Sequence, residues 1–221
     1  MRIRTLLSWS SGKDSAWTLH TLRQQGTYEV VGLLTTVNSG FDRVAMHGTR
    51  ASVLRAQAAT AGLPLIEVPL PWPCSNQQYE AVMRDACAAA VAQGIEAIAF
   101  GDLYLEDVRR YREERLTGTG ITPLFPLWGR DTTALVREML DSGLRARLTC
   151  IDTAKLPASF AGRELDTSLL AELPPGTDPC AENGEFHTCA YAGPMFAKPI
   201  SLVPGVMEQR DGFVFADFTC E

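Results

Sequence analysis

The sequence lacks most features that would take it out of the class of ordinary globular proteins. Its 20 lysines and arginines face 26 aspartates and glutamates, a formal net charge of −6, so no stable nucleic-acid binding is expected. No apolar run approaches the length of a membrane span, and the run after Met1 is too short for a signal peptide. None of the six cysteines forms a C-x-x-C pair. We therefore expect a cytoplasmic protein without a membrane partner, whose cysteines stay reduced.

The 221 residues, 46% of them apolar, suffice for one large domain and a smaller one. Apolar, β-branched runs predict strands over 3–8, 29–37, 63–70, 95–101 and 121–127. Segments of helical period lie between them, over 14–25, 49–61, 77–93 and 105–116. This alternation predicts an α/β fold with a doubly wound, parallel, five-stranded, Rossmann-like sheet. We expect its strand order to be 3-2-1-4-5.

The rhythm of the chain changes after Leu127. A helix is expected over 132–142 and a strand over 145–151, and beyond residue 157 proline and glycine become frequent. The sequence therefore predicts two domains, 1–127 and 128–221, the second a smaller α+β domain.

Small and hydroxyl-bearing residues link the first strand to the first helix. They are Ser10, Ser11, Gly12, Lys13, Asp14 and Ser15. Backbone N–H groups of such a loop can approach phosphate oxygens, and the helix N-terminus favours an anion. Lys13 adds a cation and Ser15 a hydroxyl donor. Asp14 is expected to cap the helix or to hold Mg²⁺.

The spacing of this loop is not that of the Walker loop. It resembles the PP-loop of N-type ATP pyrophosphatases, whose usual pattern is Ser-Gly-Gly-x-Asp-Ser, with Ser11 standing for the first glycine. The resemblance implies that ATP is bound here and cleaved between its α- and β-phosphates.

The switch point of the predicted sheet lies between the first and fourth strands, where ligands of such sheets bind. The fourth strand ends at Gly101 and Asp102, which we expect beside the nucleotide and the phosphate loop; capping of the next helix is the alternative for Asp102. Thr35 and Thr36, near the end of the second strand, and His47, after it, are expected to border the adenosine. A lone histidine such as His47 is more often a polar surface residue.

A second polar cluster lies in the C-terminal part, from Asp178 to Thr188. Its candidate binding residues are Glu182, Asn183, Gly184, Glu185, Phe186, His187 and Thr188. So many polar groups around one glycine are expensive to bury unless they bind something. A zinc site made of Cys180, His187 and Cys189 is disfavoured, because the spacing matches no usual zinc pattern.

The order of these motifs resembles the diphthine–ammonia ligase family. The matching features are the PP-loop, the Gly101–Asp102 tract with Arg109 and Glu113, the run 126–128, Gly162–Arg163 with Asp166, and Glu182 to Thr188. Ala181 replaces a glycine that the family pattern has between the cysteine and the glutamate. The sequence of 103–113 differs from that of the true ligases and resembles a bacterial branch of the family. The resemblance implies a HUP-type nucleotide-binding fold.

The resemblance also implies an activity. A carboxylate is adenylated by ATP, pyrophosphate leaves, and ammonia displaces AMP to form an amide. Lys13, Asp14, Asp102, Glu185 and His187 would be catalytic. Arg109, Glu113, Trp128 and the 182–188 segment would bind the acceptor, with Trp128 and Phe186 facing any cationic group.

The implied ligands and partners are ATP, Mg²⁺, free ammonium and a carboxylate acceptor, such as the diphthine residue of elongation factor 2; a homodimer is compatible with this. The main alternative is a PP-loop ligase acting on a small carboxylic acid in a bacterium. A tRNA-modifying PP-loop enzyme and a nucleotide-binding sensor are further alternatives. The tRNA-modifying enzyme is disfavoured by the absence of cysteine pairs and basic extensions.

Overall fold

The fold consists of two sheets, and a computed structural model describes residues 1–44 and 48–220. The first sheet contains β1 (Ile3–Ser8), β2 (Tyr28–Asn38), β3 (Arg43–Val44), β4 (Leu65–Leu70), β5 (Ala97–Ala99) and β6 (Thr122–Leu124). The second contains β7 (Arg145–Asp152), β8 (Phe186–Ala192), β9 (Leu202–Arg210) and β10 (Phe213–Cys220). The helices are α1 (Lys13–Gln25), α2 (Ala51–Ala61), α3 (Asn76–Ala92), α4 (Glu106–Leu116), α5 (Thr132–Asp141) and α6 (Thr167–Glu172), with a 3₁₀ turn at Ala158–Phe160.

The first sheet confirms the predicted parallel order. Its five parallel strands run β4-β2-β1-β5-β6, with β1 paired to β2 on one side and to β5 on the other. The short antiparallel strand β3 was not predicted, because two residues are too few to show a period. Both β4 and β3 pair with Val37 and Asn38 of β2. Because β4 occupies one edge of β2 there, β3 lies along the opposite edge.

Helices cover both faces of this sheet. Apolar side chains of α1 and α2 form one core with its first face, and those of α3 and α4 form a second core with the other. The predicted ends of α1 and α2 are confirmed: Gly26 and Gly62 adopt the left-handed conformation that stops a helix. A reciprocal capping box of Ser75 and Gln78 begins α3.

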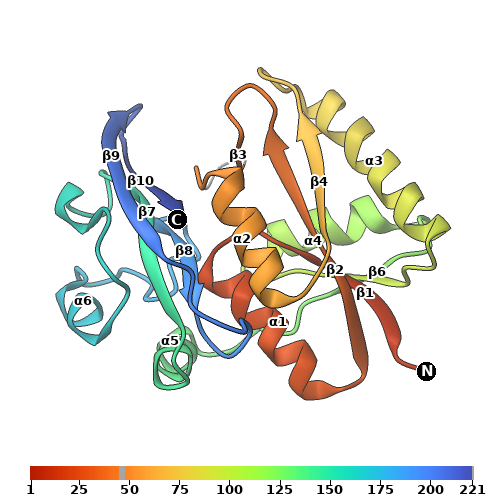
Figure 1. The fold of residues 1–221 in the computed structure, drawn as a ribbon, viewed down its shortest axis with the longest axis horizontal. Coiled ribbons are helices and arrows are strands. Elements are labelled where there is room, and N and C mark those ends of the chain that lie inside the picture. The colour runs from red at the N-terminus through yellow and green to blue at the C-terminus, as the bar shows by residue number, and fades with distance from the viewer. Residues whose placement is uncertain (45–47, 221) are drawn as a thin grey trace.

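The second sheet is antiparallel, in the order β8-β7-β10-β9. Figure 1 shows it on the other side of α1 and α2, so that these two helices lie between the sheets. Their shared core continues into α5 and β7 through Leu135, Met139 and Leu148. The second part is thus an α+β unit, as expected, and we retain 1–127 and 128–221 as the proposed division. Within the described residues, no helix combines the length and apolar character that crossing a bilayer requires.

One fully buried amide joins the two parts. Gln57, on α2, accepts a hydrogen bond from the indole N–H of Trp9 (2.8 Å). Its own amide group donates to the main-chain carbonyls of Ser11 (2.9 Å) and Ala190 (2.6 Å). One side chain therefore ties the end of β1, the loop after it and β8 together.

We predict that Gln57→Leu, which keeps the approximate volume, lowers the free energy of unfolding by on the order of 2–4 kcal/mol, because it strips hydrogen bonds from three buried groups. Urea unfolding monitored by circular dichroism measures this. Gln77→Leu, at an exposed position of α3, is the matched control and should leave the value nearly unchanged. Equal stability of the two variants would contradict the role assigned to Gln57.

Candidate active site

The phosphate loop is fixed by contacts from distant parts of the chain. Ser11 has a φ of 73° and is fully buried. Its carbonyl accepts from Gln57 and from the backbone N–H of Ala190 (2.9 Å), and its hydroxyl donates to Thr49 (2.8 Å). Ser11 therefore adopts the left-handed conformation that the usual glycine allows without strain.

Lys13 points from the loop into the second sheet. It is 2% exposed; its ammonium donates to Asp14 (2.8 Å) and to the carbonyl of Cys180, and lies 5.8 Å from the ring centre of Phe186. Its backbone N–H donates to the hydroxyl of Thr188 (3.1 Å). Burial is the largest single effect on the pKa of Lys13 and lowers it, but the charge and hydrogen bond of Asp14 together with Cys180 and Glu182 outweigh burial, and the pKa is raised. The ammonium stays protonated.

Asp14 lies in the first turn of α1. The residue before the helix is Gly12, so Asp14 does not cap it. Asp14 Oδ2 accepts from Lys13, while its buried Oδ1 has no hydrogen-bond partner among the described residues. Burial raises the pKa of Asp14 against the pull of Lys13.

The end of β5 meets the loop at the predicted switch point. A Cβ on Gly101 would lie 3.0 Å from the carbonyl carbon of Asp14 and 3.1 Å from the nitrogen of Ser15, so this glycine permits close packing on α1. The carboxylate of Asp102 is paired with Arg112 of α4, at 2.5 and 3.0 Å. Gly101 thus lets the chain pass close to the backbone of Asp14 and Ser15, and the charge of Asp102 is balanced by Arg112.

The C-terminal motif closes the site from the second sheet. Glu182 accepts from the backbone N–H of Leu103 (2.7 Å), just after β5. Asp178 accepts from the backbone N–H groups of Cys180 (3.2 Å) and Glu182 (2.7 Å). Glu185 accepts through Oε1 from Asn183 (3.2 Å); its buried Oε2 has no partner among residues 1–44 and 48–220. The expected acceptor segment and the phosphate loop form one continuous cluster.

Two groups of this cluster have strongly shifted pKa values. Burial, reinforced by the charges of Asp14 and Asp102, raises the pKa of Glu182 to about 7, although the hydrogen bond from Leu103 opposes this. Burial, with the positive charge of Lys13, lowers the pKa of His187 to about 4. Glu182 therefore titrates near neutral pH, and His187 is a neutral imidazole there.

A cavity of about 810 Å³ opens beside the loop. Its lining comes from the end of β1 and the loop after it, from β2, β3 and β5, and from α3, α4 and the turn after α4, and it includes Ser10, Thr35 and Thr36. The hydroxyl of Thr35 donates to the carbonyl of Trp9 (2.6 Å), which leaves Thr36 as the more exposed of the pair. His47, expected to border the adenosine, lies outside the described residues.

Arg109, Glu113 and Trp128 are not among the residues that line this cavity. Arg109 pairs with Glu113 at 2.8 Å, and its guanidinium lies 4.8 Å from the ring centre of Trp128 and 4.9 Å from that of Phe125. Phe186 is 2% exposed, with Lys13 over its ring. Both aromatic residues expected to face a cationic substrate therefore already face a cation of the protein.

Some residues that build the site gave weaker signals. Gln57 lies at a position of α2 where the helical period, marked by Val53, Leu54 and Ala58, calls for an apolar residue. A polar residue on the buried face of a helix could have been noticed in the sequence. Thr49 and the carbonyl of Cys180 could not have been recognised in the sequence, because only the tertiary structure shows which groups they contact.

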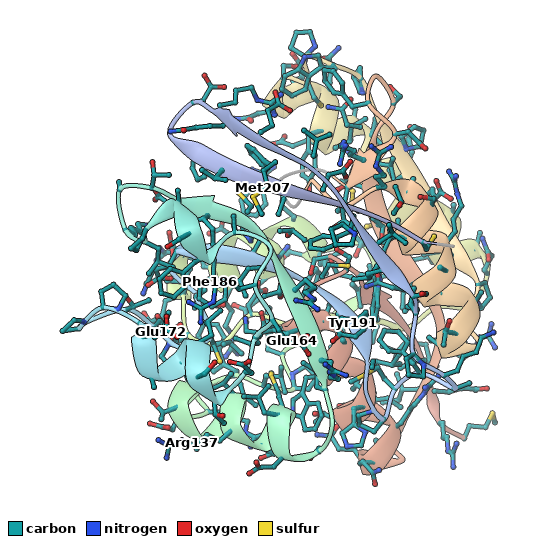
Figure 2. The ribbon with its side chains drawn as sticks, turned by 60° about the vertical axis from the view of Figure 1, so that its left-hand side comes forward. Arg137, Glu164, Glu172, Phe186, Tyr191 and Met207 are labelled. Atoms are coloured by element: carbon teal, nitrogen blue, oxygen red, sulfur yellow. The ribbon has the colours of Figure 1, made fainter. Side chains whose placement is uncertain are left out.

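Figure 2 shows the second-sheet side of this region. Phe186 begins β8, and Tyr191, near the other end of that strand, lies beside Glu164, to which its hydroxyl donates a hydrogen bond at 2.6 Å.

No group of three or more histidines, cysteines, aspartates or glutamates in the described part of the chain could hold a metal by itself. All six cysteines are free.

Family comparisons match both parts of the chain. The sequence model described as diphthamide synthase N-terminal domain matches residues 3–121, and the one described as diphthamide synthase C-terminal domain matches residues 131–215. A solved structure, the U34-tRNA thiolase NcsA of Methanococcus maripaludis, aligns with 63% of this chain and 58% of its own at 17% identity and a TM-score of 0.41. That likeness is too low to carry a conclusion.

Among curated proteins, the chain is 34% identical over 133 residues to a diphthine–ammonia ligase of Danio rerio, covering 56% of this chain and 51% of the relative. The ligase of the same name from Homo sapiens is 33% identical over 133 residues, covering 58% and 49%. The chain thus spans about half the length of the curated relatives it matches.

The raised pKa of Glu182 predicts a pH-dependent stability. Its folded pKa, about 7, lies above the ordinary value of 4.5. The contribution of this group is fully present below pH 4.5 and is lost as pH rises through 7. Relative to Glu182→Gln, the nucleotide-free wild type should lose free energy of unfolding across this window, which urea unfolding at pH 5, 6 and 8 measures.

The exposed carboxylate of Glu106 provides the control, since Glu106→Gln should reproduce the wild-type pH profile. Parallel pH profiles of wild type and Glu182→Gln would show that Glu182 ionises normally in the folded protein.

Proposed function

Because the chain belongs to the diphthamide synthase family, we propose that it is an ATP-dependent amide ligase that adenylates a carboxylate and transfers ammonia to it. One observation carries the proposal: a cation-bearing phosphate loop lies between an open cavity and a buried carboxylate cluster. Lys13 contacts that cluster directly, and Ser10 lines the cavity. Such a site can hold a nucleotide on one side and an acceptor on the other.

ATP is proposed to bind with its phosphates on Ser10 to Ser15 and its adenosine in the cavity, near Thr35 and Thr36. Ser10, Thr36 and the apolar residues Ile98 and Phe100 are among the residues that line this cavity. An apolar wall with a few polar groups is typical of nucleoside pockets. The α-phosphate then lies beside Ser10, between the cavity and Lys13.

Asp14 is the proposed Mg²⁺ ligand. Its buried Oδ1 has no hydrogen-bond partner among the described residues, so this oxygen is available to bind a cation. A single carboxylate together with phosphate oxygens is a usual Mg²⁺ environment. When bound, the ion neutralises charge on the departing pyrophosphate.

In the first step, a carboxylate oxygen of the acceptor attacks the α-phosphorus, and the bond to the bridging α,β oxygen breaks. The products are an acyl-adenylate and pyrophosphate. Lys13 stabilises the negative charge on the leaving group, and the fixed loop keeps the phosphates in line. The site contributes mostly position and charge rather than covalent chemistry.

In the second step, ammonia attacks the acyl carbon, AMP leaves with the bonding electron pair, and the nitrogen releases a proton to give the amide. Ammonium must first lose a proton. Glu182, with a pKa of about 7, matches the requirement for a base at neutral pH better than His187, with a pKa of about 4. Glu185 and His187 are proposed to orient the ammonia, and Asp102 to hold α4 in place through Arg112.

The proposed acceptor is a diphthine-type carboxylate, and a small carboxylic acid is the alternative. Asn183, Gly184, Phe186 and Thr188 complete the proposed acceptor segment, with Arg109, Glu113 and Trp128 at its periphery. Incubation with ATP and ¹⁵N-ammonium, with either diphthine-bearing elongation factor 2 or a panel of small acids, separates the two. The acceptor that gains ¹⁵N in an amide is the substrate.

We place the reaction in the cytoplasm, in keeping with six free cysteines. A homodimer stays a prediction, which sedimentation equilibrium tests.

The mechanism predicts AMP and pyrophosphate as products, because the bond that breaks in the first step joins the α-phosphorus to the α,β bridging oxygen. Chromatography of a turnover mixture measures the nucleotide formed. Lys13→Ala should abolish the signal, since it removes the cation from a site that holds several negative charges. ADP as the main wild-type product, at a level that Lys13→Ala does not change, would come from a contaminating ATPase; ADP that disappears in Lys13→Ala would contradict the mechanism.

Glu185→Gln removes one charge with little change of shape and should separate acceptor chemistry from ATP binding. We expect an ATP Kd close to that of the wild type and amide formation slower by about 10²–10⁴-fold, the usual contribution of an orienting or acid–base group. Equilibrium nucleotide binding and single-turnover kinetics measure the two effects. If a folded Glu185→Gln protein no longer binds ATP, Glu185 belongs to the nucleotide site instead.

A further inference from the structure

An aspartate near the C-terminus holds two arginines that belong to the first part of the chain. The carboxylate of Asp217, on β10, accepts from Arg43 of β3 at 2.8 Å. It also accepts from Arg50, which precedes α2, at 3.0 and 2.9 Å through Nε and at 2.5 Å through Nη2. Its side chain is 13% exposed. Burial alone would raise the pKa of Asp217, but hydrogen bonds from Arg50 and Arg43 outweigh it and hold the pKa at about 2.

These arginines fix the position of Thr49. Thr49 directly precedes Arg50, and its carbonyl accepts from the backbone N–H of Val44, next to Arg43 (2.8 Å). Arg43 also donates to the carbonyl of Gly48 (2.7 Å). The segments on both sides of Thr49 are therefore anchored on one carboxylate group. Without that carboxylate, both guanidinium groups would lose the counterion that they share.

Thr49 in turn holds the phosphate loop. Its hydroxyl accepts the hydrogen bond of the Ser11 hydroxyl at 2.8 Å, and both residues are buried. Ser11 has a φ of 73°, a conformation that an L-residue adopts only when its surroundings hold it there. The contacts thus run without a gap from β10 to the loop proposed to bind phosphate.

We propose that Asp217 is a positioning residue for nucleotide binding, which keeps Ser11 in its left-handed conformation through Arg50 and Thr49. Asp217 is remote in sequence from the loop and acts on it only through these intermediate residues. The inference rests on the proposed function, because it takes the Ser10–Ser15 loop to be the phosphate site.

The test is a double-mutant cycle on the full chain, with the ATP Kd as its measurement. Asp217→Asn keeps the shape and removes the charge; we expect the Kd to rise roughly 5–10-fold, about what the left-handed conformation of one L-residue can account for. In a Ser11→Gly background the same substitution should change the Kd by less than about twofold, because glycine adopts a positive φ without strain.

The matched control is Asp211→Asn, whose side chain is 88% exposed in the turn between β9 and β10. It should leave the Kd unchanged in both backgrounds. Thr49→Val removes the hydroxyl while Asp217 stays intact, and it should raise the Kd where Ser11 is present but not in the Ser11→Gly background. This variant answers the question even if Asp217→Asn fails to fold, which circular dichroism would reveal.

The outcomes separate the two proposals. A folded wild type that does not bind ATP overturns the proposed function, and this inference with it. A wild type that binds ATP while Asp217→Asn and Thr49→Val leave the Kd unchanged overturns this inference alone. Equal losses in the wild-type and Ser11→Gly backgrounds also overturn it, because they would show a general structural effect rather than control of the Ser11 conformation.

Discussion

The carbonyl of Ser11 is the point at which the two sheets and the phosphate loop meet. It accepts one hydrogen bond from Gln57 on α2 and another from the backbone of Ala190 on β8. A buried carbonyl needs such partners, and here both come from elements far away in the sequence. The loop conformation therefore exists only once the second sheet has docked on α1 and α2. A change in the position of the second sheet relative to α2 would therefore also change the conformation of the loop.

Charge in the enclosed site is balanced locally and incompletely. Lys13 stands near the carboxylates of Asp14 and Glu182, and its ammonium also takes the carbonyl of Cys180. Buried charge is tolerated when it is paired and hydrogen-bonded. Two carboxylate oxygens, Asp14 Oδ1 and Glu185 Oε2, have no such partner within the described residues. An unpaired carboxylate oxygen of Asp14, whose other oxygen contacts the ammonium of Lys13, suits a site that takes up cations together with phosphates.

The arginines of α4 shape the neighbourhood of the site through aromatic rings. Arg112 pairs with Asp102 and lies 4.5 Å from the ring centre of Phe100. Phe100 stacks on Phe125, which also contacts Arg109 and Trp128. A substrate with a cationic group would have to compete with these guanidinium groups for the ring faces. These contacts between arginines and aromatic rings hold α4 beside the cavity, which Phe100 and Arg112 line.

The sequence by itself determined the alternation of parallel strands and helices, the place of the phosphate loop and the polar residues that end the fourth strand. Each of these follows from local patterns: strand and helix periods, a small-residue loop at a strand end, and a glycine at Gly101. It also singled out Glu182 to Thr188 as a polar cluster. The sequence overextended the last strands of the first sheet, predicted over 95–101 and 121–127 but present at Ala97–Ala99 and Thr122–Leu124, because apolar residues continue past the last ladder hydrogen bond.

Only the tertiary structure decided which of these groups share a site. The contact of Lys13 with the Cys180 carbonyl joins positions 167 residues apart, and no local pattern encodes such a pairing. The same holds for Thr49 on Ser11, for Asp217 on Arg50, and for the burial that moves the pKa of Glu182 to about 7. A main-chain carbonyl has no residue type to recognise, and desolvation depends on what packs around a group. Those properties belong to the packed chain and not to the order of its residues.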